Sequence, residues 1–138
     1  MKKKKIEALI LILLLVVFFG CKNNKKDNSI NYNKKANSSW RWDFKDKYLF
    51  IISIDSISMS YISGNYCYTF NKNKTDCRTH FRGKSSEDGN IYSVKFKSNY
   101  CNDVGKSYIY IFKDSIVWET IQQPCSQIIL PKRCQLEQ

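Results

Sequence analysis

The sequence predicts an all-β domain over residues 40–138, folded as a small antiparallel meander in which a barrel is favoured over a two-sheet sandwich. Apolar residues recur at every second position in short segments, as they do in strands with one buried face. The links between these segments are of hairpin size. After residue 21, apolar residues do not keep helical spacing beyond about two turns, so little helix is expected.

The first half of this domain contains a change in the phase of its apolar pattern. A dense apolar run at residues 48–54 predicts a strand. The apolar residues at 57–61 then share one face, whereas those at 62–70 share the opposite face. A β-bulge or bend near Gly64 would explain this change. Two strands joined by a turn at residues 63–65 would explain it equally well.

The middle of the domain is predicted to alternate between short strands and exposed loops. Polar residues 71–74 indicate a turn, and residues 77–81 a short strand. Residues 82–90 are predicted to be a loop. The clearest alternation in the chain follows at residues 91–98, where Tyr92, Val94 and Phe96 share the face expected to be buried.

The last part of the domain is predicted to contain a loop, a hairpin and a closing segment. Residues 99–107 are expected to form the loop. The hairpin joins strands at residues 108–112 and 116–121. Residues 128–130 then form either a last short strand or a cover over an open end of the barrel, and Pro131 ends them.

Five cysteines follow Cys21, and in an oxidising compartment they would form disulfides. They are Cys67, Cys77, Cys101, Cys125 and Cys134. Because five is odd, one thiol is left over, and about fifteen two-bridge patterns are possible. A hairpin centred on Lys72 places Cys67 opposite Cys77, which predicts that pair. The second expected pair is Cys125–Cys134, with Cys101 free or intermolecular.

The start of the chain has the parts of a secretory signal peptide. Lysines at positions 2–5 precede an uncharged apolar run at residues 8–20, and Cys21 follows it. A membrane-spanning helix needs about 20 apolar residues, more than this run contains. A plain signal peptide is the other alternative, but it gives no reason for Gly20-Cys21 at the boundary.

The residues Phe18-Phe19-Gly20-Cys21 resemble the lipobox of bacterial lipoproteins, although Phe18 stands where leucine is most usual. This resemblance implies cleavage before Cys21, a diacylglycerol on its sulfur and an acylated new N-terminus. It predicts a lipoprotein anchored in a membrane of the cell envelope on the extracytoplasmic side. Lys22 is not the aspartate associated with inner-membrane retention, which slightly favours an outer membrane where there is one.

The chain is therefore expected to divide into a signal peptide at residues 1–20, a tether at residues 21–39 and the β domain at residues 40–138. The tether is rich in Lys and Asn and almost without large apolar residues, a composition typical of disorder. A polybasic stretch beside a lipid anchor is also attracted to anionic headgroups.

The net charge of the folded part is lower than that of the whole chain. The chain has 23 Lys and Arg against 12 Asp and Glu. From Trp40 onward, 14 basic residues face 10 acidic ones. The sequence shows no clustered stripe of Lys and Arg in the domain. Together with the predicted export, this argues against a nucleic-acid partner.

Motifs for chemistry are few. His80 is the single histidine, and no G-x-S-x-G, H-E-x-x-H or phosphate-binding glycine loop occurs. The absence of C-x-x-C pairs argues against a metal site. The carboxylates at positions 76, 87, 88, 103 and 114 fall in predicted turns, where Asp is favoured for backbone reasons. No enzyme and no cofactor are expected, although a pocket holding His80 beside two acidic groups would indicate an enzyme.

The middle and end of the chain resemble a group of small uncharacterised bacterial exported β proteins. The resemblance is carried by ISGNYCYTF at residues 62–70, then by Gly89, Ile91, Val94, Phe96, Ile116-Val117-Trp118-Glu119, Ile121 and Leu130-Pro131-Lys132. It implies the extent of the domain and brings no activity with it.

The expected function is that of a non-enzymatic binding module held at the envelope, acting on another envelope protein or on an incoming protein. An inhibitor of a wall-degrading enzyme or an immunity-type partner of a toxin is the concrete version, by analogy of fold. Trp40 and Trp42 share one face and either plug the barrel end or mark a contact site. The alternatives are a small apolar-ligand-binding barrel, against which a filled interior would argue, and a structural accessory of the envelope.

Overall fold

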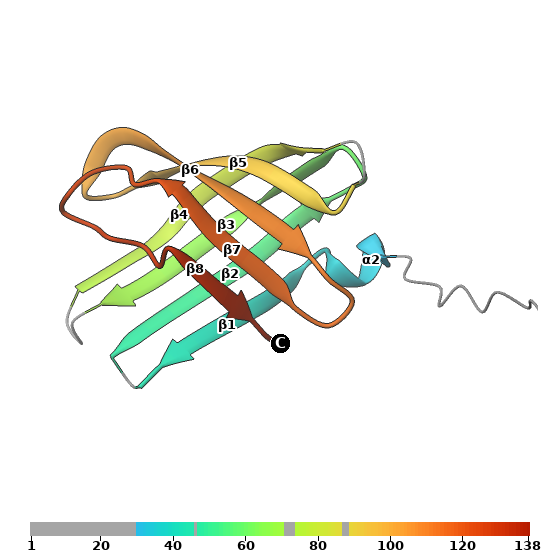
Figure 1. The fold of residues 1–138 in the computed structure, drawn as a ribbon, viewed down its shortest axis with the longest axis horizontal. Coiled ribbons are helices and arrows are strands. Elements are labelled where there is room, and N and C mark those ends of the chain that lie inside the picture. The colour runs from blue at the N-terminus through green and yellow to red at the C-terminus, as the bar shows by residue number, and fades with distance from the viewer. Residues whose placement is uncertain (1–29, 46, 71–73, 87–88) are drawn as a thin grey trace, which may run out of the picture.

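Eight antiparallel strands follow one another in a single sheet whose spatial order equals their order in the chain (Figure 1). The structure is a computed structural model that describes residues 30–45, 47–70, 74–86 and 89–138. A short helix, α2 (Tyr32–Lys35), precedes the strands. The strands are β1 (Ser38–Phe44), β2 (Tyr48–Ile57), β3 (Tyr61–Phe70), β4 (Lys74–Ser85), β5 (Ile91–Ser98), β6 (Cys101–Ile111), β7 (Ile116–Gln122) and β8 (Arg133–Leu136). The predicted all-β meander is confirmed.

The sheet curls into a nearly closed barrel, as the sequence predicted. The first and last strands meet at Arg41 and Glu137. The backbone N–H of Arg41 donates to the carbonyl oxygen of Glu137 at 2.8 Å. The N–H of Glu137 donates in turn to the carbonyl oxygen of Arg41 at 2.9 Å. Because β8 has four residues, whereas β1 has seven, this contact closes the barrel over a short stretch.

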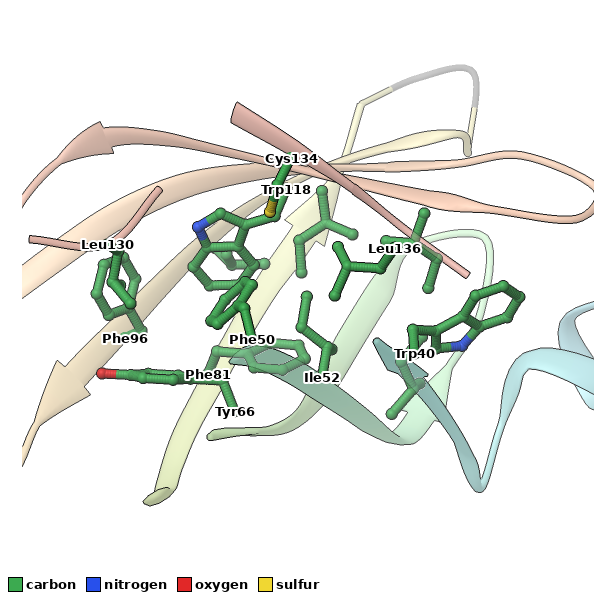
Figure 2. Packing of buried hydrophobic residues seen from close by; sticks show 14 of the residues in the cluster. Trp40, Phe50, Ile52, Tyr66, Phe81, Phe96, Trp118, Leu130, Cys134 and Leu136 are labelled. Carbon is green, nitrogen blue, oxygen red and sulfur yellow. The ribbon is translucent and has the colours of Figure 1, made fainter. Parts of the chain in front are cut away.

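Packed aromatic rings fill the middle of the barrel (Figure 2). The indole of Trp118 on β7 lies at the centre of this packing. The ring centroids of Phe50, Tyr66, Phe81 and Phe96 lie 5.2, 6.2, 5.9 and 5.4 Å from it. The indole N–H donates to the hydroxyl of Thr120 at 2.9 Å, so its polar atom is satisfied inside the barrel.

Residues 30–39, assigned from composition to a disordered tether, are folded onto one end of the barrel. The side chain of Asn31 caps α2 by accepting from the N–H of Lys34 at 3.2 Å. The ammonium of Lys35 lies 3.9 Å from the centroid of the Trp40 ring and donates to the carbonyl of Lys113 at 2.8 Å. The Tyr32 hydroxyl donates to the carbonyl of Gly89 at 3.0 Å. These contacts to turns that are distant in the sequence order a segment that is polar by composition. Residues 21–29, Cys21 among them, and the predicted signal peptide at residues 1–20 lie outside the described residues.

The change of phase has a different position from the one expected. A register shift between Ile54 and Ser56 turns the inward face from even to odd positions within β2, and the turn follows at residues 58–60. Residues 63–65 lie inside β3, so the turn proposed there is wrong. A Cβ on Gly64 would lie 2.1 Å from the carbonyl oxygen of Ser53 and 2.7 Å from the Phe81 ring. This glycine therefore marks a close approach inside the sheet.

Two predicted loops are mostly strand. β4 continues to Ser85, and β6 begins at Cys101, so residues 82–85 and 101–107 lie in strands. Most of their polar side chains face outward, with Ser107 as a buried exception, and composition alone does not distinguish such strands from a loop. The strand at Ile91–Ser98 and the hairpin between β6 and β7 are confirmed.

The closing segment covers the barrel end and does not form the last strand. Ile128 and Leu130 are buried and belong to the hydrophobic core cluster, part of which Figure 2 shows. Ile128 makes an isolated bridge with Cys125, whereas the last strand is β8, beyond Pro131. Of the two expectations for residues 128–130, the cover is therefore the one that the structure has.

One of the two expected disulfides is present, and the other is replaced. Cys67 is bonded to Cys77, its partner in the register of β3 and β4. Cys125 is bonded to Cys101, so the expected Cys125–Cys134 pair is wrong.

Cys134 is a buried free thiol whose side chain points into the barrel near Trp118 (Figure 2), because alternate residues of β8 face inward. Burial raises the pKa of this thiol to about 12. Two disulfides indicate an oxidising, extracytoplasmic location.

Candidate functional site

The candidate site is a groove of about 680 Å³ on the outer face of the sheet, mainly over β3, β4 and β5. Its basic lining comes from Arg78, His80 and Arg82 on β4 and from Lys95 and Lys97 on β5. All five side chains are exposed. The groove is thus a cationic surface outside the barrel.

The groove forms where β4 and β5 separate. The two strands pair from Ser85 and Tyr92 as far as Phe81 and Phe96, and not beyond. On the other side of β4, Arg78 is an extra residue in the register with β3, and it has a positive φ of 61°. Such a bulge bends its strand and increases the local twist. The bulge accompanies the departure of β4 from β5, and the groove lies above the gap.

A buried hydrogen-bond network holds the two strands across this gap. The carboxylate of Asp76 is fully buried. The hydroxyl of Tyr66 lies 2.8 Å from Asp76 Oδ2 and 2.9 Å from the carbonyl oxygen of Lys97, and donates its one proton to either. The backbone N–H and the side-chain amide of Asn99 donate to Asp76 Oδ1 at 3.0 and 2.9 Å. Burial raises the pKa of Tyr66, so its hydroxyl keeps the proton that it donates.

Cations from three strands lie side by side on the outer face. Arg82 is the register partner of Lys95, and Lys95 is the register partner of Lys106. These three exposed residues are called the basic row below. Directly opposed like charges repel one another in a sheet. Within the described ranges the recorded ion pairs are Arg41–Asp43 and Arg133–Glu119, and neither involves the basic row.

This arrangement corrects the sequence-based inference that the domain has no cluster of Lys and Arg. The cations are separated in the chain and are brought together by the strand register. A pattern in the sequence could have revealed them, because basic residues occupy every second position at 78, 80, 82 and 84 and again at 95 and 97. Alternate residues of a strand share a face. The argument against nucleic acid therefore rests on the predicted export alone.

The tryptophans named from the sequence do not line the groove. Trp40 is 1% exposed and lies under Lys35, so its ring plugs the barrel end beside α2. Trp42 is half-buried on β1 and stacks on Phe44 with a centroid distance of 5.7 Å. Trp42 remains accessible for a contact, but it is not among the residues that line the groove.

His80 lies in the groove, with one carboxylate among the lining residues. That carboxylate belongs to Asp55, whose Oδ2 accepts from the side-chain amide of Asn65 at 2.9 Å. Among the described residues, no group of three His, Cys, Asp or Glu side chains is placed to hold a metal ion. In the same part of the chain, no helix has the length and apolar character that a membrane span requires.

Comparison of the chain with models of protein families, with curated proteins and with solved structures gave no match. The site is therefore interpreted from its own geometry and charge.

Replacing Asp76 by Ala should lower the free energy of unfolding by about 3 kcal/mol, because the donors of Asn99 lose a buried charged acceptor. Urea unfolding followed by tryptophan fluorescence under non-reducing conditions measures this loss. The matched control is Asp103→Ala, an exposed carboxylate whose removal should change the free energy by less than about 0.5 kcal/mol. Equal effects of the two substitutions would contradict the role given to the buried network.

Proposed function

We propose that this chain is a non-enzymatic binding module, held at the cell envelope by a lipid on Cys21, that binds an acidic protein through the groove. The observation that carries the proposal is the basic row, Arg82, Lys95 and Lys106, exposed and outside the recorded ion pairs. Clusters of one sign of charge attract partners of the opposite sign and accelerate their association.

The filled interior supports binding on the outside of the barrel. A barrel that holds a small apolar ligand needs space between its inward side chains. Here the rings around Trp118 occupy the middle, with centroids 5.2–6.2 Å from the indole (Figure 2). The ligand-binding alternative therefore has less support than a surface contact. No specific feature favours a structural accessory over a binding module.

Two exposed tyrosines beside the basic row support a polypeptide partner. Tyr61 on β3 is 39% exposed, and Tyr108 on β6 is 40% exposed. They lie in one register row, which runs from Tyr61 through Lys84 and Ser93 to Tyr108, next to the basic row. Tyrosine suits protein interfaces because it combines an apolar ring with a polar hydroxyl.

The charge of the groove narrows the kind of partner. If the module is an inhibitor or an immunity-type protein, its target is a toxin or wall-degrading enzyme with an acidic patch. A target that presented a basic surface to the groove would be repelled. The proposed role is binding without catalysis. The charged groove residues around His80 are mainly cations, and the one carboxylate that lines the groove, Asp55, already accepts a hydrogen bond from Asn65.

Reversing the charge of the groove should abolish capture of the partner. The mature chain, residues 21–138 with Cys21→Ser, is immobilised and exposed to envelope and secreted proteins at low salt. The amount of acidic protein captured should fall at least tenfold with the Arg82→Glu/Lys95→Glu variant, because two contacts become repulsive. The control Lys45→Glu/Lys47→Glu carries the same charge change away from the groove and should retain capture. A partner retained by both variants would refute the groove as the binding surface.

The anchor has a separate test. The Cys21→Ser variant of the full chain should lose labelling by a radioactive fatty acid, because serine lacks the sulfur that would carry the diacylglycerol. It should also leave the membrane fraction, because two or more acyl chains are needed for stable attachment. A Cys67→Ser variant, which removes a cysteine of the folded domain, should still be labelled. Continued labelling of Cys21→Ser would overturn the lipoprotein assignment.

A further inference from the structure

We propose that the basic row is held in mutual repulsion in the free protein, and that carboxylates of an acidic polypeptide segment laid across β4, β5 and β6 relieve it. This inference rests on the proposed function and names the part of the partner that enters the groove. The repulsion lowers the stability of the free domain, and it acts at the surface that binds the partner.

The repulsion follows from the register. Neighbouring strands lie about 4.8 Å apart, so the row from Arg82 to Lys106 extends over about 10 Å with Lys95 in its middle. Lys95 therefore has a cation on each side. Side chains of this length bend away from one another, which reduces the repulsion without removing it. Salt screens what remains, because all three side chains are exposed to water.

On β4, β5 and β6, the rows next to the basic row supply no carboxylate to it. On one side, the outward residues of β4, β5 and β6 are Lys84, Ser93 and Tyr108. On the other side, they are His80, Lys97 and Val104. Each of these side chains is neutral or basic. Two carboxylates lie beside these strands, and both have partners. Glu119, the register partner of Tyr108, pairs with Arg133 at 2.7 Å, and Asp55 accepts from Asn65 at 2.9 Å. The charge that complements the row therefore comes from another molecule.

The spacing fits a polypeptide with carboxylates at alternate positions. In an extended chain, every second side chain points the same way, at intervals of about 6.6–6.8 Å. Two such carboxylates reach across the row, one near Arg82 and Lys95 and the next near Lys95 and Lys106. The planar guanidinium of Arg82 binds a carboxylate through two parallel hydrogen bonds. Tyr61 and Tyr108 offer ring surface to the rest of the segment.

The first part of the test needs no partner. In the mature chain with Cys21→Ser, Lys95→Glu should raise Tm by about 3–6 °C at low ionic strength, because two repulsive contacts become attractive. Lys95→Gln should raise Tm by about half as much, and the rise should shrink at about 0.5 M salt. Lys47→Glu makes the same change in net charge outside the row and serves as the control. A Tm of either Lys95 variant equal to or below that of the control would overturn the inference.

The second part tests the class of ligand. A peptide of alternating serine and glutamate should raise the Tm of the unsubstituted chain. The Lys95→Glu variant should bind the same peptide with an affinity at least tenfold lower. Stabilisation by inorganic polyphosphate with none by the peptide would overturn the polypeptide assignment. If Lys95→Glu loses the captured protein without any gain in Tm, stored repulsion is wrong while the proposed function stands. A gain in Tm with capture retained refutes the proposed function, and with it the ligand assigned to the row.

Discussion

The buried carboxylate of Asp76 is the constraint on which the candidate site depends. A sheet whose strands separate leaves backbone polar groups to be satisfied in another way. Here the side chains of Tyr66 and Asn99 cross the gap between β4 and β5 and meet at this carboxylate. The side chain of Asn99 also donates to the carbonyl of Cys77 at 2.9 Å. The gap can therefore persist as part of a stable fold, and the groove above it keeps its shape.

The aromatic core decides which residues are left to form the outer face. Trp118 and the rings around it select the inward parity of β2, β3, β4, β5 and β7, since a slip by one residue would place these rings in water. The outward parity then carries the cations of β4, β5 and β6. The core stabilises the domain, whereas the like charges on its outer face do not contribute to folding stability. That contrast connects the packing of the barrel with its proposed binding role.

Local pattern predicted the fold class well and long-range register poorly. The strand Ile91–Ser98 was predicted to the residue because apolar and polar side chains alternate without interruption. The Cys67–Cys77 pair followed from the geometry of one hairpin. The Cys101–Cys125 bond and the basic row depend on how distant segments are aligned, which composition does not record. Asp76 resembled a turn residue because the network that buries it involves three strands and the turn after β5.

The central claim is that the groove over β4 and β5 is the binding surface of the domain. It is tested most directly by ¹⁵N–¹H NMR of residues 21–138 with Cys21→Ser, titrated with the acidic peptide at low salt. The account predicts that amide shifts change along the basic row and its neighbours, at residues 78–84, 93–97 and 104–108, and that Lys95→Glu abolishes these changes. Shifts that cluster around Trp42 and Phe44 on β1, or no shifts at all, would contradict it.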